Sequence, residues 1–123
     1  MSEPKTIFIV EDDPDLVELY KIIIERNGKY AVLGAATNGE EAIEKYKVFN
    51  EKPDLILMDH RMPLKDGIET TIELLKLDGN LRILFVSADV SVREKALEIG
   101  AVGFLDKPSS MKEFLKEIEK YLE

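Results

Sequence analysis

Polar and charged side chains follow four of the five short apolar runs in this chain, directly after each run ends. Three carboxylates come early, a fourth comes in the middle, and a hydroxyl, a fifth carboxylate and a lysine come late. These residues are Glu11, Asp12 and Asp13 after residues 7–10, Asp59 after residues 55–58, Ser87 after residues 83–86, and Asp106 and Lys107 after residues 102–105. One such residue alone is ordinary for a helix cap or a solvated loop, but their repeated placement at run ends favours a shared site.

The chemistry open to such a set is limited. Carboxylates that lie close together repel each other, and burial penalises their charged forms. A hard divalent cation such as Mg²⁺ (or Mn²⁺) relieves this repulsion, because it prefers oxygen ligands and binds one or two carboxylates along with water. A cation, a lysine and a hydroxyl together form a pocket for a phosphoryl group. A carboxylate in that pocket could act as the nucleophile and form an acyl phosphate.

The elements that must position these residues follow from the hydrophobic pattern. The five apolar runs are apolar at consecutive positions, which is typical of strands buried on both faces of a parallel sheet. They are Ile7–Val10, Val32–Ala36, Leu55–Met58, Ile83–Val86 and Val102–Leu105. Because each run is followed by a segment of helical period, the order is five β-α units. The sequence therefore predicts an α/β fold with a doubly wound, five-stranded parallel sheet in a single domain spanning residues 1–123.

Capping residues mark the helices. Asp13 before Pro14 predicts a helix start, and serine, asparagine or aspartate three residues before glutamate predicts four more. These four are Asn38-x-x-Glu41, Asp66-x-x-Glu69, Ser91-x-x-Glu94 and Ser110-x-x-Glu113. Gly28, Gly79 and Gly100 stand where a left-handed residue ends a helix. The apolar stripes predict buried faces, including Met111 in the last helix and an unusually apolar third helix, where Leu77 indicates either extra packing or a contact surface.

Composition narrows the function classes. The chain has 123 residues, a net charge of −8, no cysteine and one histidine. The acidic balance argues against direct nucleic-acid binding, which needs a basic face. Without cysteine, thiolate metal sites and disulfide scaffolds are excluded. No apolar run approaches the length of a membrane helix, and no secretory leader opens the sequence, so we expect a cytoplasmic protein that does not bind membranes.

Four motifs in order resemble the receiver domain of two-component response regulators, over essentially the whole chain. They are Ile9-Val10-Glu11-Asp12-Asp13, then Asp54-Leu-Ile-Leu-Met-Asp59 with Met62-Pro63 and Asp66-Gly67, then Val86-Ser87-Ala88, and last Gly100-Ala101 followed by Lys107-Pro108. The resemblance implies a flavodoxin-like fold with strand order 2-1-3-4-5. It also implies a single-domain, stand-alone regulator, since no output domain accompanies these motifs.

The resemblance assigns roles to the polar residues. Asp59 would be the phosphoacceptor. Asp12 would bind Mg²⁺ directly, Glu11 would act mainly through a metal-bound water, and the backbone carbonyl of Arg61 would be a further ligand. Lys107 would pair with the acceptor carboxylate and later with a phosphoryl oxygen. Glu11 departs from the more frequent aspartate, a common variant that changes the water-mediated contact only slightly.

Two residues would carry the switch. Ser87 would bind the phosphoryl group and move towards it, and Phe104 would turn inward as Ser87 moves. Phe104 departs from the frequent tyrosine, so a partner that reads a hydroxyl there would lose that contact. The resemblance also implies a cis peptide bond between Lys107 and Pro108.

Arg61 and Asp89 each lie two residues beyond a pocket residue, and in the family these positions influence the lifetime of the phosphoryl group. We hypothesise that the two side chains pair across the pocket mouth and hinder attacking water; the alternative is two separate solvated charges. His60 follows the acceptor directly, but strand alternation predicts that it points away from Asp59, so a phosphohistidine is not expected.

The function implied is a phosphorylation switch. A sensor histidine kinase would phosphorylate Asp59, and the surface formed by the fourth helix, fifth strand and fifth helix would then bind an effector or a phosphotransfer protein. Candidate contact residues there are Ser91, Val92, Lys95 and Met111. The chain would be a monomer or a weak dimer through this surface. Alternatives from other classes are a metal-dependent phosphohydrolase, a flavin-binding module and a degenerate receiver that serves as a scaffold.

Overall fold

Five strands form one parallel sheet in the order β2-β1-β3-β4-β5. The computed structural model describes residues 3–26, 28–107 and 109–123. The strands are β1 (Lys5–Val10), β2 (Tyr30–Ala36), β3 (Leu55–Met58), β4 (Ile83–Ser87) and β5 (Gly103–Asp106). The helices are α1 (Pro14–Glu25), α2 (Gly39–Val48), α3 (Gly67–Leu77), α4 (Arg93–Glu98) and α5 (Met111–Leu122), with a 3₁₀ turn, η1 (Val90–Val92), before α4. The predicted fold class and strand order are confirmed.

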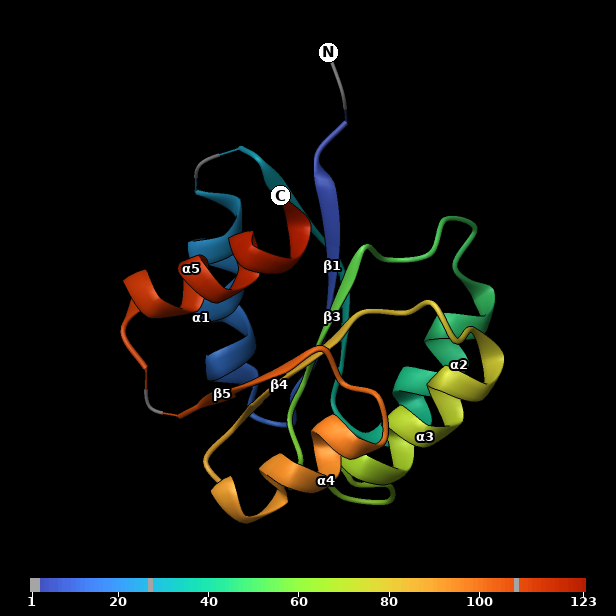
Figure 1. Cartoon of the computed structure of the whole chain (residues 1–123). Helices are drawn as coiled ribbons and strands as arrows, with labels where there is room; N and C mark the ends of the chain where they lie inside the picture. Colours follow the sequence, from blue (N-terminus) through green and yellow to red (C-terminus); the bar gives the residue numbers. More distant parts are fainter. Residues whose placement is uncertain (1–2, 27, 108) are drawn as a thin grey trace.

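The helices cover both faces of the sheet (Figure 1). Helices α1 and α5 lie on one face, and α2, α3 and α4 lie on the other. Successive strand residues point to opposite faces, so in β1 Ile7 and Ile9 pack under α1 and α5 while Phe8 and Val10 pack under the other three helices. This explains why the central strands read as continuous apolar runs.

Three of the predicted helix starts form as the sequence indicates. Asp13 caps α1, and both Asp66 and Ser110 form complete capping boxes with the glutamate three residues later. In α2 the Asn38 side chain accepts the predicted bond from the Glu41 N–H. The Glu41 carboxylate, however, reaches one residue further back to the Thr37 N–H, 2.7 Å away.

The predicted box at Ser91 is wrong. Asp89 accepts hydrogen bonds from both the N–H and the hydroxyl of Ser91, which winds residues 90–92 into η1 instead. Helix α4 therefore begins at Arg93, with Val92 at the capping position and no side-chain cap. Asp89 thus binds the Ser91 N–H that the Glu94 side chain would bind in a capping box, and the Ser91 hydroxyl donates to Asp89 instead of accepting from the Glu94 N–H.

Helix α3 ends just before Gly79 as predicted, but the left-handed conformation expected at this glycine is wrong. Among the described glycines only Gly28 and Gly100 have positive φ, at 74° and 116°. After α3 the chain leaves the helix at Asp78, which adopts an extended backbone and accepts a bond from the Asn80 N–H. Because the aspartate turns the chain, no left-handed glycine is needed there.

Two apolar side chains on the helix stripes are exposed: Met111, which the sequence places on a buried face, and Leu77, for which the sequence leaves extra packing or a contact surface open. Met111 is 49% exposed and Leu77 is also 49% exposed. In α1 the buried residues are Val17, Tyr20, Ile23 and Ile24, whereas Leu16 is only partly buried. Among the described residues, no helix is long and apolar enough to cross a membrane.

Candidate phosphoryl-acceptor and metal site

The carboxyl ends of β1, β3, β4 and β5 meet at one edge of the sheet, and the chemistry-bearing residues of the sequence lie there. Glu11 follows β1, Asp59 follows β3, Ser87 ends β4 and Lys107 follows β5. Backbone bonds join these ends, since the Asp59 N–H donates to Val10 and the Lys107 N–H donates to Ser87, each at 3.0 Å. The parallel register therefore converts four distant sequence positions into one site.

Three carboxylates gather at this edge. Glu11, Asp12 and Asp59 each offer one oxygen, and these oxygens lie within 4.8 Å of one another. Glu11 is 3% exposed and Asp59 is 8% exposed, whereas Asp12 is exposed. Such a set of oxygen donors, partly open to water, fits Mg²⁺ or Mn²⁺, because these cations take carboxylates and retain water ligands. Arg61, the expected source of a carbonyl ligand, lies in the loop after β3 that borders this cluster.

Lys107 is the cation that holds this cluster together. Its Nζ lies 2.7 Å from Glu11 Oε1 and 3.4 Å from Asp59 Oδ1, and its side chain is 18% exposed. The resemblance implies a pair with the acceptor carboxylate, and the structure adds a closer pair with Glu11. The lysine therefore bridges two carboxylates that would otherwise repel.

Glu11 is the most perturbed acid of the site. Burial, with a smaller contribution from the neighbouring charge of Asp59, raises the pKa of its carboxyl to about 7, although the bonds from Lys107 and the Asp13 N–H act to lower it. A carboxyl poised near neutral pH can lose its proton when a cation arrives. A cation bound through this carboxylate would therefore displace a proton.

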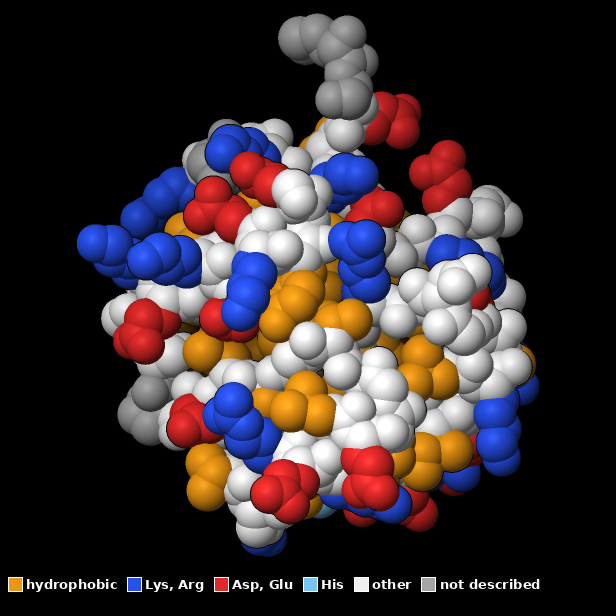
Figure 2. Space-filling model, viewed as in Figure 1, with side chains coloured by type: hydrophobic (Ala, Val, Ile, Leu, Met, Phe, Trp, Pro, Cys, Tyr) orange, Lys and Arg blue, Asp and Glu red, His pale blue; other side chains and the backbone are white. Residues whose placement is uncertain are grey.

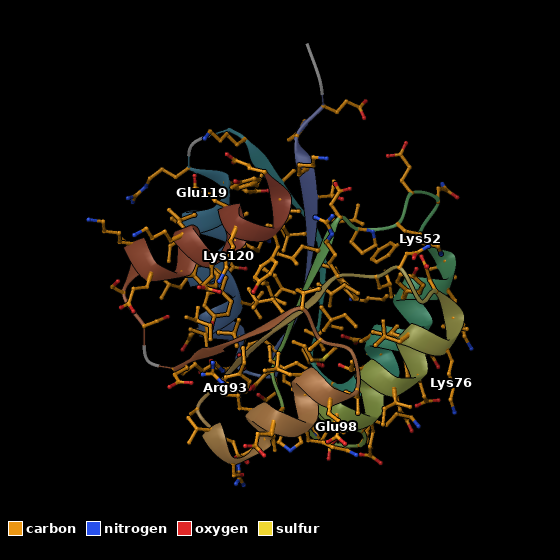
Figure 3. The ribbon with its side chains drawn as sticks, in the orientation of Figure 1. Lys52, Lys76, Arg93, Glu98, Glu119 and Lys120 are labelled. Carbon is orange, nitrogen blue, oxygen red and sulfur yellow. The ribbon has the colours of Figure 1, made fainter. Side chains whose placement is uncertain are left out.

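The two switch candidates lie on the adjacent strands. Ser87 is 1% exposed, and its hydroxyl oxygen accepts a bond from the Asp89 N–H at 3.1 Å. Phe104 is 8% exposed and stacks on Phe85, with the ring centroids 6.3 Å apart. The guanidinium of Arg93, which Figure 3 places near β5 at the start of α4, lies 6.0 Å from the Phe104 ring centroid. In this structure the phenyl ring is therefore already turned into the fold.

Arg61 and Asp89 form an ion pair. Arg61 Nη2 lies 3.0 Å from Asp89 Oδ2, with the arginine 80% exposed and the aspartate 12% exposed. Both residues line a cavity of about 470 Å³, together with Asp12, His60, Met62, Pro63 and Asp66. Bonds from Ser91 lower the pKa of Asp89, with a contribution from Arg61. The predicted pairing is confirmed, while its effect on water stays a prediction.

The backbone of His60 binds the Asp59 carboxylate. Its N–H donates to Asp59 Oδ1 at 2.8 Å, which orients the carboxylate. The imidazole Nδ1 is buried with no hydrogen-bond partner among the described residues. The expected cis bond at Lys107–Pro108 lies outside the described residues, because the structure does not describe Pro108.

Two neighbours of the site were missed by reasoning from the sequence. A Cβ added at Gly67 would lie 2.3 Å from the carbonyl oxygen of Asp59. Only glycine therefore allows the start of α3 to pack this closely against the backbone of Asp59. Tyr20 of α1 has a raised pKa, mainly from burial and then from the carboxylates of Glu11 and Asp59. The Asp66-Gly67 motif was a usable signal for the glycine, but no sequence spacing links Tyr20 to the site.

Comparisons with known proteins agree with this geometry. The family model described as the response regulator receiver domain matches residues 7–119. The chemotaxis protein CheY of Thermotoga maritima is 39% identical over 121 residues, covering 94% of this chain and 98% of that protein. CheY of Bacillus subtilis is 37% identical over 118 residues, covering 94% of this chain and 96% of that one.

A solved structure shows the same fold. A chain from the crystal structure of the CheX–CheY–BeF3–Mg²⁺ complex from Borrelia burgdorferi superposes with a TM-score of 0.90. It has 27% sequence identity, and the match covers 98% of this chain and 90% of that one.

Proposed function

Because this chain belongs to the response regulator receiver domain family, we propose that Asp59 accepts a phosphoryl group from a sensor histidine kinase. The observation that carries the proposal is the placement of Lys107 between Glu11 and Asp59, inside a cluster of three carboxylates. An isolated acidic cluster would be a cation site only. A buried acceptor beside a lysine can also bind and receive a dianionic group.

The transfer uses the residues as follows. A carboxylate oxygen of Asp59 attacks phosphorus, the bond from phosphorus to the donor nitrogen breaks, and the electron pair stays on that nitrogen. A Mg²⁺ or Mn²⁺ ion held by Glu11, Asp12, Asp59 and the Arg61 carbonyl would supply the charge that offsets repulsion between the carboxylate and the phosphoryl oxygens. Lys107 then exchanges its Asp59 contact for a phosphoryl oxygen, and the Ser87 hydroxyl donates to another.

The same residues link the acceptor to the α4-β5-α5 surface. The Ser87 hydroxyl accepts a hydrogen bond from the Asp89 N–H, and Asp89 caps η1, which precedes α4. Phe104 lies on β5, the strand next to that of Ser87. On the face shown in Figure 2, apolar side chains gather between the charged groups over α4, β5 and α5. A cavity of about 370 Å³ opens there, lined by Arg93, Phe104, Leu105, Asp106, Ser109 and Glu113. Phosphorylation would shift the population of this surface between two states.

The readout would be contact with another protein. The similar chain from Borrelia burgdorferi was crystallised with CheX, BeF3 and Mg²⁺, which supports a protein partner and a cation for this chain. The partner here would be an effector or a phosphotransfer protein, and the chain itself a cytoplasmic monomer or weak α4-β5-α5 dimer. Ser91, Lys95 and Met111 are exposed for such contact, while Val92 is partly buried against the core.

Intact mass after incubation with acetyl phosphate and Mg²⁺ tests the proposal. We expect one added phosphoryl group that is lost on standing and is absent in Asp59→Asn and in the presence of EDTA. Release of phosphate over many turnovers without an adduct would instead indicate a metal-dependent phosphohydrolase. Cation binding with neither adduct nor turnover would indicate a scaffold.

A further inference from the structure

The phenyl ring of Phe104 lies between the core and a surface cavity. On its inner side it stacks on Phe85, its cross-strand neighbour on β4, and Phe85 is fully buried. On its outer side Phe104 lines the cavity of about 370 Å³ on the α4-β5-α5 surface. A ring that left the core would enter this cavity, so two positions are open to it, inward and outward. The structure shows the inward position, with Phe104 8% exposed.

Arg93 lies at the boundary between these two positions. Its guanidinium carbon is 6.0 Å from the centroid of the Phe104 ring, and the residue lines the same cavity. Figure 3 shows Arg93 at the start of α4, beside β5. A guanidinium at this distance is attracted by the electrons of an aromatic ring. The arginine therefore favours the inward ring and covers it on the cavity side.

Other partners for Arg93 are present nearby. The carboxylate residues Asp106 and Glu113 line the same cavity. Within the described ranges of the chain, however, Arg93 forms no ion pair with either of them, and its side chain interacts with the Phe104 ring. The position of the guanidinium is therefore set by the ring and not by a salt bridge.

The chemistry of the Phe104 side chain acts in the same direction. A phenyl ring has no polar atom, so an outward ring would expose apolar surface to water without gaining a hydrogen bond. A tyrosine in the same place would lose less, because its hydroxyl could bind water in the outward position. The phenyl ring and Arg93 therefore both favour the inward state.

The short turn η1 fixes the backbone of Arg93 relative to the acceptor site. The Arg93 N–H donates to the Val90 carbonyl, and Asp89 caps η1 by accepting from the Ser91 N–H. The Asp89 N–H donates in turn to the Ser87 hydroxyl at 3.1 Å. Local hydrogen bonds therefore connect Ser87, at the acceptor site, to the segment that carries Arg93.

We propose that Arg93 is a positioning residue that holds Phe104 inward in the unphosphorylated protein. The inward ring is also the arrangement expected in the phosphorylated protein, so this part of the α4-β5-α5 surface is formed before a phosphoryl group binds. A state that is already populated binds the group that selects it more tightly. This consequence for binding rests on the proposed function, whereas the position of the ring does not.

Fluorine NMR of the protein labelled with 4-fluorophenylalanine tests the position of the ring. The chain has five phenylalanines, and the Phe104 resonance is the one that disappears in Phe104→Leu. The change in its chemical shift between H2O and D2O measures exposure to solvent. In Arg93→Ala this change should increase about two- to fivefold, the population shift that one exposed cation–π contact provides. Glu94→Ala, at the next exposed residue of α4, is the control and should match the parent.

Calorimetric titration with beryllofluoride, an analogue of the phosphoryl group, in the presence of Mg²⁺ tests the connection to the acceptor site. Arg93→Ala should weaken binding about two- to fivefold, through the same population shift. In a Phe104→Leu background the same substitution should have no effect, because the guanidinium then has no aromatic ring to hold. A merely structural role of Arg93 in α4 would weaken binding in both backgrounds.

An unchanged solvent effect on the Phe104 resonance in Arg93→Ala would overturn the proposal. Equal weakening of beryllofluoride binding in the two backgrounds would also overturn it. If the parent itself did not bind beryllofluoride with Mg²⁺, that result would contradict the function proposed for Asp59 instead. The fluorine measurement needs no bound group, so it would still decide the role of Arg93.

Discussion

Arg61 and Asp89 meet at 3.0 Å in the cavity that Asp12 and His60 also line, although 28 positions separate them in the sequence (89 − 61). The loop after β3 carries the arginine, and the loop after β4 carries the aspartate. The other oxygen of Asp89, Oδ1, accepts a hydrogen bond from the Ser91 N–H. The ion pair therefore links the loop after β3 to η1. The pair therefore lies between the site and the first element of the α4-β5-α5 surface.

Removal of this pair should shorten the lifetime of the acyl phosphate. We expect Arg61→Ala/Asp89→Ala to lose phosphate faster by a factor below about ten, because an ion pair this exposed is weak. The measurement is the decay of the phosphorylated mass after excess donor is removed. Lys65→Ala/Glu73→Ala, which removes a 2.7 Å ion pair between the same loop and α3, should decay like the parent. Unchanged decay in the first variant would show that the ion pair does not restrict water.

Cation binding should weaken as the pH falls below about 7. Glu11 must lose its proton to bind through its carboxylate, and burial raises its pKa to about 7. Below that pH, Mg²⁺ affinity should fall about tenfold per pH unit, since one proton is displaced. Titration calorimetry across this range checks the slope. In Glu11→Gln the slope should largely disappear between pH 5 and about 7, and retention of the parent slope would assign the proton to another group.

The raised pKa of Glu11 also determines how the free energy of unfolding of the metal-free protein changes with pH. The folded state holds the Glu11 proton more tightly than the unfolded chain, in which a glutamate has its ordinary pKa of 4.5. Between these two pH values the folded state binds more protons, so the free energy of unfolding should decrease as the pH rises from 4.5 to about 7. Urea unfolding in EDTA should show this decrease in the parent and a smaller one in Glu11→Gln.

Gly67 should not tolerate a side chain. An alanine Cβ there would lie 2.3 Å from the Asp59 carbonyl oxygen and 2.9 Å from the His60 Cα, both backbone atoms. We expect Gly67→Ala to cost about 1–3 kcal/mol of unfolding free energy and to slow phosphorylation by acetyl phosphate, because the acceptor loop must move. Gly79→Ala is the matched control, since its nearest neighbouring atom would be 3.8 Å away. Equal stability of the two variants would contradict the close packing of α3.

Two adjacent buried threonines should respond oppositely to valine. The Thr71 hydroxyl is buried without a partner among the described residues, whereas the Thr70 hydroxyl donates to the Asp66 carbonyl at 2.7 Å. Thr71→Val should raise the free energy of unfolding by about 1 kcal/mol, and Thr70→Val should lower it by a similar amount. Chemical denaturation of both variants measures the difference. A loss of stability in Thr71→Val would indicate a partner for that hydroxyl in solution.

The strands and most caps were predictable because their causes are local. Consecutive apolar residues predict a strand buried on both faces, and Asp66 or Ser110 with a glutamate three residues on predicts a helix start. The errors at Ser91 and Gly79 arose where an aspartate, Asp89 or Asp78, bound nearby backbone and replaced the expected cap or turn. At each place the bond to the aspartate and the expected cap or turn were alternatives for the same stretch of backbone. The sequence pattern alone did not show which of the two would form.

The sequence by itself determined which residues stand at the strand ends, and so the membership of the site. Only the tertiary structure decided their contacts: Lys107 closer to Glu11 than to Asp59, Phe104 turned inward, and the Arg93 guanidinium beside the Phe104 ring. The physical reason is that strand order and register set distances between positions far apart in the chain. Local sequence preferences do not specify such distances, but the burial and the electrostatics of the assembled site depend on them.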